Sequence, residues 1–212
     1  MNARHSNRSD VFYYRIVFFL LCVVIALTWW HPPTPYEQAL HGSLTIIGFV
    51  VWYLYMRRYR MSLWAFTSIA AFIALHSIGA RWMYSFVPYD DWFNTLFSVR
   101  LNAWMGWQRN HYDRLIHLMY GVCFMPALTE WLQQRNCLSL RTASWGALVI
   151  IMLTGLWYEW FEWGVAMVLS PEDAEAYNGQ QGDIWDPHKD MLIASLGGLV
   201  SLMFRRSWGN RF

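Results

Sequence analysis

Six long apolar segments separated by polar turns make up most of this chain. A helix that spans the hydrocarbon of a bilayer needs about 20 predominantly apolar residues. Two of the six segments are shorter than this, so they must borrow flanking residues or thin the bilayer locally. The pattern predicts an all-α bundle of about six transmembrane helices, forming one membrane domain over residues 1–212. The segments run approximately over residues 12–30, 40–56, 62–80, 112–132, 144–168 and 190–204.

The connection from Arg81 to Asn110, between the third and fourth segments, is long enough to hold a further element. Apolar residues recur in it at helical spacing, which indicates a short amphipathic helix. Such a helix either lies on the outer membrane surface or packs over the bundle as a lid. The residues that carry the pattern are Trp92, Phe93, Leu96, Phe97, Leu101 and Trp104.

Composition agrees with a membrane protein whose main partner is the lipid bilayer. Hydrophobic residues make up 56% of the chain and charged residues only 14%, whereas a soluble domain carries about 25% charged residues. The 15 Trp and 12 Tyr suit the two membrane–water interfaces. A net charge of +2 is too small to indicate nucleic-acid binding, and three cysteines form no disulfide framework.

The distribution of basic residues predicts the orientation. The first apolar segment follows a basic stretch and lacks a small-x-small cleavage site, so it is interpreted as a retained signal anchor. With the N-terminus inside, 11 of the 16 basic residues fall on the inner side. This bias predicts six spans in a bacterial inner membrane, with both termini in the cytoplasm. The inner residues are Arg4, Arg8, Arg15, Arg57, Arg58, Arg60, Arg135, Arg141, Arg205, Arg206 and Arg211.

Acidic residues concentrate on the opposite, outer side, where 12 of the 14 fall. Asp113 and His117 share one helix face at the start of the fourth segment, and Glu159 and Glu162 share one near the outward end of the fifth. Asp190 opens the sixth. A lone ionisable group inside a bilayer costs several kcal/mol. We therefore expect these side chains to face one another across the interior of the bundle, near its periplasmic end.

These residues have the chemistry of a catalytic or metal-binding site. Carboxylates with histidine suit Zn, Mn or Fe, and carboxylates with water suit Mg, so Asp113, His117, Glu159 and Glu162 are candidate ligands of a divalent ion. The same four residues and Asp190 are candidates for acid–base catalysis. The spacing matches no strong metal motif such as HExxH or CxxC. Arg81, Arg109 and Arg114 are candidates for contacts with a phosphate or head group.

Several of the polar residues also have purely structural interpretations. Asp186 before Pro187 fits an N-cap followed by proline at the first helical position. Asn110 with Asp113 resembles a capping box at the start of the fourth segment. His76 alone is more typical of a hydrogen-bonded core residue. The acidic pair of the fifth segment lies within a helix, where no capping role exists.

The sixth segment carries small residues at a spacing that permits close helix contact. Ala194 with Gly198, and Gly197 with Ser201, form small-xxx-small pairs. Close packing of this helix holds Asp190 rigidly against its neighbours. Simple helix packing is the alternative explanation.

Several stretches of this chain resemble the YjdF-like family of bacterial inner-membrane proteins. The resemblance covers most of residues 60–205 and implies a multipass inner-membrane location, but it brings no activity with it. Its motifs are RNHYDRLIH (109–117), YEWFEW (158–163), GDIWDPHKDM (182–191) and LHSIGA (75–80), followed by Tyr84.

A partial likeness to the VanZ-like membrane proteins covers two short segments. It rests on Asp113, Arg114 and His117, and on Asp190 ahead of the Gly197–Gly198 pair. The acidic pair of the fifth segment is not part of it, and no function is transferred on this basis.

Three functions fit these features. The first is a metal-assisted enzyme that acts at the outer leaflet on a lipid or a lipid-linked envelope substrate. The second is a small proton-coupled transporter, since intramembrane acids with histidine are typical of proton relays. The third is a non-catalytic scaffold of the cell envelope. Replacement of Glu159 and Glu162 by glutamine separates the first two from the third.

Overall fold

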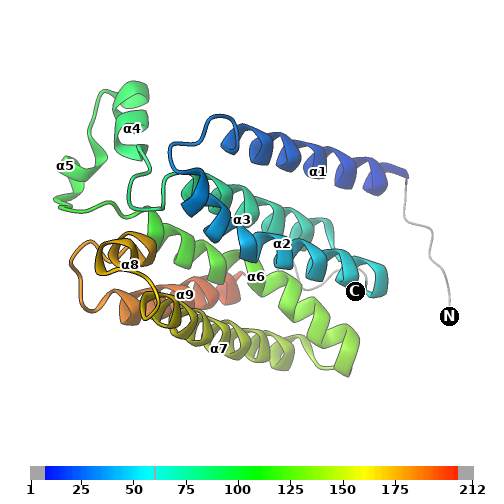
Figure 1. Cartoon of the computed structure of the whole chain (residues 1–212). Coiled ribbons are helices and arrows are strands. Elements are labelled where there is room, and N and C mark those ends of the chain that lie inside the picture. The colour runs from blue at the N-terminus through cyan, green and yellow to red at the C-terminus, as the bar shows by residue number, and fades with distance from the viewer. Residues whose placement is uncertain (1–7, 60, 205–212) are drawn as a thin grey trace.

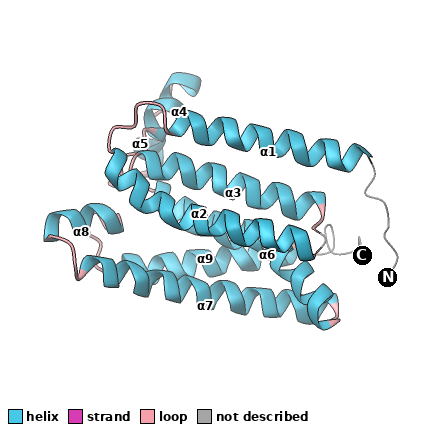
Figure 2. Ribbon diagram, turned by 45° about the vertical axis from the view of Figure 1, so that its right-hand side comes forward, coloured by secondary structure: helices cyan, strands magenta, loops and turns pink. Residues whose placement is uncertain are grey.

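The computed structural model describes residues 8–59 and 61–204, and this part of the chain contains nine helices and no strand. Six long helices lie side by side and alternate in direction (Figures 1 and 2). The predicted all-α bundle is therefore confirmed. The basic positions Arg4, Arg60, Arg205, Arg206 and Arg211 lie outside the described residues. The long helices are α1 (Arg8–Thr28), α2 (Pro35–Arg58), α3 (Leu63–Arg81), α6 (Tyr112–Asn136), α7 (Leu140–Ala166) and α9 (Asp186–Met203).

Five of the described helices, α1, α2, α3, α6 and α7, are long and apolar enough to cross a membrane. The sixth long helix, α9, is not among them because its 18 residues include the charged Asp186, Lys189 and Asp190. At about 1.5 Å per residue, α9 is nevertheless about 27 Å long, close to the 30 Å of a bilayer core. The two segments that looked too short are lengthened by polar flanking residues: α2 begins at Pro35 and α9 at Asp186.

Two short helices, α4 (Tyr89–Phe97) and α5 (Leu101–Met105), stand in place of the single helix predicted to reach Trp104. The predicted amphipathic helix is present as α4, but its extension to Trp104 was wrong because Ser98 adopts the left-handed conformation, with φ 56°, and ends α4. The side chain of Arg100 then bonds to Asp90 and Asp91 at 3.1 and 2.9 Å. These bonds hold the start of α5 close to α4.

The α4–α5 segment projects from one end of the bundle (Figure 1). Helix α4 has no buried residue, and Leu96 and Phe97 are among its most exposed side chains. A further helix, α8 (Pro171–Asn178), lies at the same end and has no counterpart in the prediction, because its sequence is polar and lacks apolar periodicity. We call the end that carries α4, α5 and α8 the site end.

Helix α6 occupies the centre of the bundle and contacts α3, α7 and α9. Its approach to α9 is close enough that backbone meets backbone. A Cβ atom on Gly121 would lie 2.0 Å from the carbonyl oxygen of Ala194, and one on Gly197 would lie 2.2 Å from that of Leu118. The close contact predicted from the small residues of the sixth segment is thus confirmed.

One acidic residue, Glu130, lies far from the site end and has a structural role. It is fully buried in α6 and accepts hydrogen bonds from the backbone nitrogen of Ser62, at 3.0 Å, and from its hydroxyl, at 2.5 Å. The Ser62 hydroxyl in turn accepts from the nitrogen of Ala65 at 3.1 Å. Glu130 therefore extends the N-cap of α3 and fixes that helix against α6.

We expect the substitution Ser62→Ala to destabilise the protein by roughly 2–3 kcal/mol, because it removes an N-cap and leaves one oxygen of the buried Glu130 carboxyl group without its hydroxyl donor. The matched control is Ser139→Ala, which removes the exposed N-cap of α7 at a cost of about 1 kcal/mol. Thermal unfolding in detergent micelles measures both. Equal losses of stability would show that Glu130 adds nothing to the cap.

Candidate functional site

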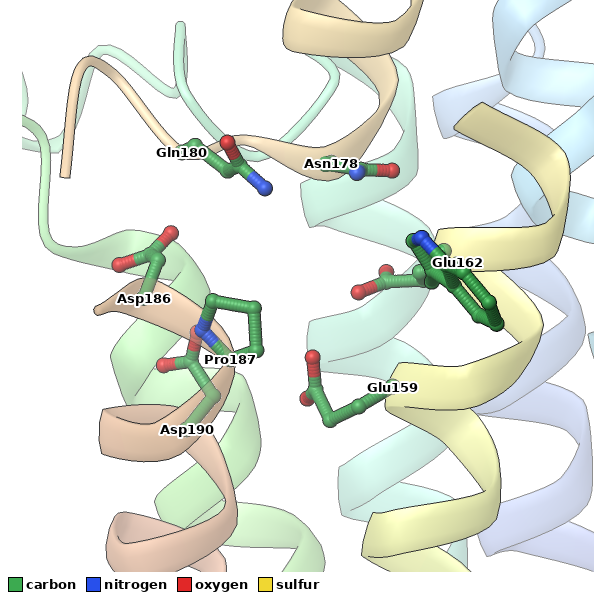
Figure 3. Close-up of a pocket in the computed structure, with 8 residues that line it drawn as sticks. Glu159, Glu162, Asn178, Gln180, Asp186, Pro187 and Asp190 are labelled. Carbon is green, nitrogen blue, oxygen red and sulfur yellow. The ribbon is translucent and has the colours of Figure 1, made fainter. Parts of the chain in front are cut away.

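A small cavity lies between α7 and α9 at the site end, and Figure 3 shows the side chains around it. Its volume is about 80 Å³. One water molecule needs on the order of 10–15 Å³ of such space, so the cavity holds a few waters or a hydrated ion but no large molecule. The lining residues are Glu159, Glu162 and Trp163 of α7, Asn178 and Gln180, and Asp186, Pro187 and Asp190 of α9.

Beside this cavity, two residues of α6 join Asp190 of α9. Asp113 and His117, one helical turn apart, place a carboxylate oxygen and Nε2 3.7 Å from each other. One ligand atom from each of Asp113, His117 and Asp190 lies within 4.8 Å of the other two. The close approach of α6 and α9 produces this cluster, since Asp190 lies in the second turn of α9, alongside the first turns of α6.

Two carboxylate oxygens at the cavity have no hydrogen-bond partner among the described residues. They are Oε1 of Glu159 and Oδ1 of Asp190, on side chains that are 7% and 3% exposed. Figure 3 shows Glu159 extending from α7 towards α9, the helix that carries Asp190 on the other side of the cavity. Because a buried polar group without a partner is costly, this arrangement indicates that a ligand or water completes the site.

Arg109, which precedes α6, anchors the first turn of α9. Its guanidinium forms two parallel hydrogen bonds with the carboxylate of Asp186, at 2.6 and 3.2 Å. The same group also donates to the carbonyl oxygens of Gly179 and Gln180, both at 3.0 Å. Asp186 is only 1% exposed, so this pair is buried and fixes the chain between α8 and α9.

A second, more exposed group of charges continues from this pair. Asp183 accepts from Arg114 at 2.7 Å and from Lys189 at 2.5 Å. The Lys189 ammonium, with help from the backbone of Trp185 and from Arg114, lowers the pKa of Asp183 to about 2. Burial, followed by the charges of Arg114 and Arg109, lowers the pKa of His111. At neutral pH this group of charges therefore contains an ionised carboxylate, Asp183, and a neutral imidazole, His111.

The capping interpretation of Asp186 is wrong. The residue before α9 is Trp185, and no side chain caps the helix; Asp186 lies inside the first turn, where Arg109 binds its carboxylate. At the start of α6 the capping prediction holds in part, since Asn110 Oδ1 accepts from the nitrogen of Tyr112 at 3.0 Å. Asp113 does not take part in this cap; its carboxylate lies beside the imidazole of His117.

Arg81, which the sequence grouped with Arg109 and Arg114, is engaged elsewhere. Its guanidinium donates to the carbonyl oxygens of Thr28, Trp30 and His31, at 2.6 to 3.2 Å. Arg81 thus provides hydrogen-bond donors for backbone carbonyl groups at the C-terminal end of α1. The structure brings together the five residues proposed for catalysis and the two later arginines, but it gives Arg81 a different set of partners.

Sequence reasoning missed a set of contacts between histidines and tyrosines near the site end. The Tyr84 hydroxyl lies 2.6 Å from Nδ1 of His76, which confirms His76 as a hydrogen-bonded core residue. His41 of α2 stacks on Tyr177 of α8, with ring centroids 4.6 Å apart. Burial raises the pKa of Tyr177 to about 12 and that of Tyr84 well above 10. The histidines lie in apolar helices and the tyrosines in a turn and in the polar α8, so no local pattern indicated that these rings would meet.

Fold and site together define a multipass helical membrane protein with a buried cluster of acids and histidine at one end of the bundle. The chain belongs to the family described as "Predicted membrane protein (DUF2238)", whose model matches residues 13–211. It is 28% identical over 151 residues to the inner membrane protein YjdF of Escherichia coli (strain K12), a match that covers 70% of this chain and 67% of that protein. The predicted YjdF-like resemblance is confirmed. No solved structure matches.

Proposed function

We propose that this protein is an inner-membrane enzyme that uses a divalent metal ion, held by Asp113, His117 and Asp190, to act on a lipid or lipid-linked substrate of the cell envelope. The observation that carries the proposal is the convergence of these three side chains beside the cavity. Histidine with two carboxylates suits Zn, Mn or Fe. Three protein ligands leave coordination positions for water and substrate, as in catalytic metal sites.

The distances support binding of one ion. Two ligands at about 2.0–2.2 Å from the same ion lie at most roughly 4.4 Å apart. The 3.7 Å between His117 and Asp113 is already within this reach. All three ligand atoms lie within 4.8 Å of one another, so binding one ion needs a side-chain movement of at most a few tenths of an ångström. Glu159, across the cavity, supplies a fourth ligand or a separate base.

Six membrane crossings, with the site end in the periplasm and both termini in the cytoplasm, are part of this proposal. The basic residues Arg57, Arg58, Arg135 and Arg141 belong to the ends of α2, α6 and α7 opposite the site end. That distribution agrees with cytoplasmic placement of those ends. Pairing of Asp186 with Arg109 lowers the cost of inserting α9 as the sixth span. An inner-membrane location follows the name of the YjdF relative.

The residues around the metal site suit hydrolysis or group transfer at a phosphate or ester. A bound divalent ion lowers the pKa of water and stabilises the developing negative charge. Glu159 lines the cavity, and its carboxyl group is placed to take a proton from such a water. Arg114 keeps one buried nitrogen, Nε, without a partner in the described residues. It is therefore a better candidate for a phosphate contact than Arg109, whose donors already have acceptors.

The surroundings favour a substrate that stays in the bilayer. A cavity of about 80 Å³ admits only the reacting group. Around it, Trp163, Ile184 and Trp185 are 66%, 79% and 58% exposed. Exposed tryptophans suit the membrane interface, so a lipid tail stays outside while its head group reaches the metal.

Metal content of the protein purified in detergent without chelators tests the proposal. We expect close to one Zn, Mn or Fe per chain in the wild type, and at least about a ten-fold lower affinity in Asp190→Asn and in His117→Asn. The control is Asp91→Asn on the exposed α4, which should leave the metal content unchanged. Wild-type protein without a bound divalent metal, or equal content in the ligand variants, would refute the metal site.

Glutamine variants of Glu159 and Glu162 then test catalysis. If Glu159 is the base, Glu159→Gln keeps the metal and loses turnover of envelope lipids and isoprenoid-linked phosphates in mixed micelles. General-base removal typically reduces the rate by about 10²–10⁴-fold. A cell phenotype that survives both glutamine substitutions, in protein that remains folded, would favour the scaffold function. Proton or solute flux in proteoliposomes without lipid turnover would favour the transporter.

A further inference from the structure

A second and larger cavity lies outside the acidic site, between α1, α2 and α3. Its volume is about 320 Å³, at the lower end of the range for small-molecule sites. Its walls are almost entirely apolar and include Ile25 of α1, with Ile46 and Phe49 of α2. Helices α1 and α2 each pack on α3 but make few contacts with each other. The cavity therefore occupies a gap between two helices of the bundle.

The lining of this cavity is long enough for an extended hydrocarbon chain. It follows α2 from Gln38 to Phe49, a rise of about 16 Å at 1.5 Å per residue. An extended acyl or alkyl chain of about a dozen carbons has a comparable length, at roughly 1.3 Å per carbon–carbon bond along the chain. Two lining residues, Trp29 and Ile46, are 46% and 68% exposed. The cavity thus opens sideways, towards the region that lipid occupies.

The end of the cavity nearest the site end carries an unsatisfied hydrogen-bond acceptor. Gln38 is 1% exposed, and its Nε2 donates to the carbonyl oxygen of Thr28 at 3.1 Å. Its Oε1 has no partner among the described residues. A buried amide oxygen without a donor is costly, so the cavity offers an apolar channel with one acceptor at its head.

From this combination we infer that the gap between α1 and α2 binds a single-chain amphiphile whose head carries a hydroxyl group. The hydroxyl donates to Oε1 of Gln38, and the chain extends past Gly42 towards Phe49. Gln38 lies in the first turn of α2, near the membrane interface, where the polar head of a lipid also lies. The inference is independent of metal binding at the acidic site.

Photo-crosslinking of the full-length protein in detergent tests this site. The probe is 1-hexadecanol with a diazirine in mid-chain, and its methyl ether, which lacks the donor, is the comparison. We expect saturable labelling of α1 and α2 by the alcohol, competed by unlabelled hexadecanol, with the ether weaker by about five-fold, the effect of one lost hydrogen bond. Equal labelling by alcohol and ether overturns the assignment, without any need for a variant.

Three variants on α2 locate the site. Gly42→Leu fills the cavity and should reduce labelling at least about five-fold, and Gln38→Met should make alcohol and ether equal by removing the acceptor. The control is Gly48→Leu, since Gly48 is exposed and has open space where a Cβ would lie; its labelling should match the wild type. Labelling of Gly42→Leu at the wild-type level would show that the probe reports only general contact with the protein surface. An equal reduction of labelling in Gly48→Leu and Gly42→Leu would show the same. Metal content, measured in the same samples, keeps this result separate from that of the acidic site.

Discussion

Replacement of Gly197 by alanine is expected to separate α9 from α6 and to abolish metal binding at the candidate site. The added Cβ would lie 2.2 Å from the carbonyl oxygen of Leu118 and 3.2 Å from the nitrogen of Val122. These are backbone atoms of a helix, which no change of rotamer moves aside. The helices must therefore part, and Asp190, two turns before Gly197, must move away from Asp113 and His117.

Two effects add in the Gly197→Ala variant. Overpacking of a tight core costs about 1–3 kcal/mol, occasionally more. A displacement of about 1 Å at a site that needs ligands in place typically costs on the order of 100-fold. We therefore expect a lower unfolding temperature in detergent and at least about a 100-fold loss of metal affinity. Gly121→Ala, whose Cβ would meet Ala194 from the other side at 2.0 Å, should behave in the same way.

Gly155→Ala on α7 is the matched control, because a Cβ at that position meets open space. Alanine there should leave stability and metal affinity at wild-type values, or raise stability slightly through the better helix propensity of alanine. Metal titration of the purified variants, followed by thermal unfolding, provides both measurements. Normal metal binding by Gly197→Ala would contradict the close packing of α6 and α9 as the basis of the site.

The long helices were predictable because apolar runs of this length have few alternatives in a membrane. Their ends were less predictable. Pro35 and Asp186 begin helices several residues before the apolar runs do, since the first turn of a helix tolerates proline and acidic side chains. Helix α8 escaped prediction because a polar surface helix lacks apolar periodicity. The break at Ser98 depends on a backbone conformation that serine seldom adopts.

The gathering of acids was predictable from the cost of lone charges in hydrocarbon, but the individual partners were not. Side-chain direction depends on how each helix is rotated, and no local pattern records this. Asp186 had the sequence of an N-cap, and only the fold shows that Arg109, 77 positions earlier, reaches it. Likewise, Glu130 and Ser62 meet across 68 positions of sequence. Such long-range pairs are consequences of helix packing.

The substitution Arg109→Ala is expected to destabilise the protein by about 3–5 kcal/mol, the loss typical when one partner of a buried ion pair is removed. Asp186 would remain almost fully buried, with only the 3.2 Å contact to Arg114. The carbonyl groups of Gly179 and Gln180 would lose their donors as well. Because these residues hold the connection from α8 to α9, the cavity between α7 and α9 should open to solvent. Thermal unfolding and limited proteolysis of residues 178–185 measure the two effects.

Two further variants separate the loss of charge pairing from the loss of geometry. Arg109→Lys keeps the positive charge but cannot form the paired hydrogen bonds with Asp186. Its unfolding temperature should therefore lie between those of the wild type and Arg109→Ala. Arg109→Ala combined with Asp186→Asn removes the uncompensated charge and should recover part of the stability. The surface control is Arg100→Ala, whose partner acids lie on α4 and whose side chain is 56% exposed; it should have little effect. If Arg109→Ala is as mild as Arg100→Ala, the buried pair does not hold α9 in place, and some other contact must position Asp190 beside His117.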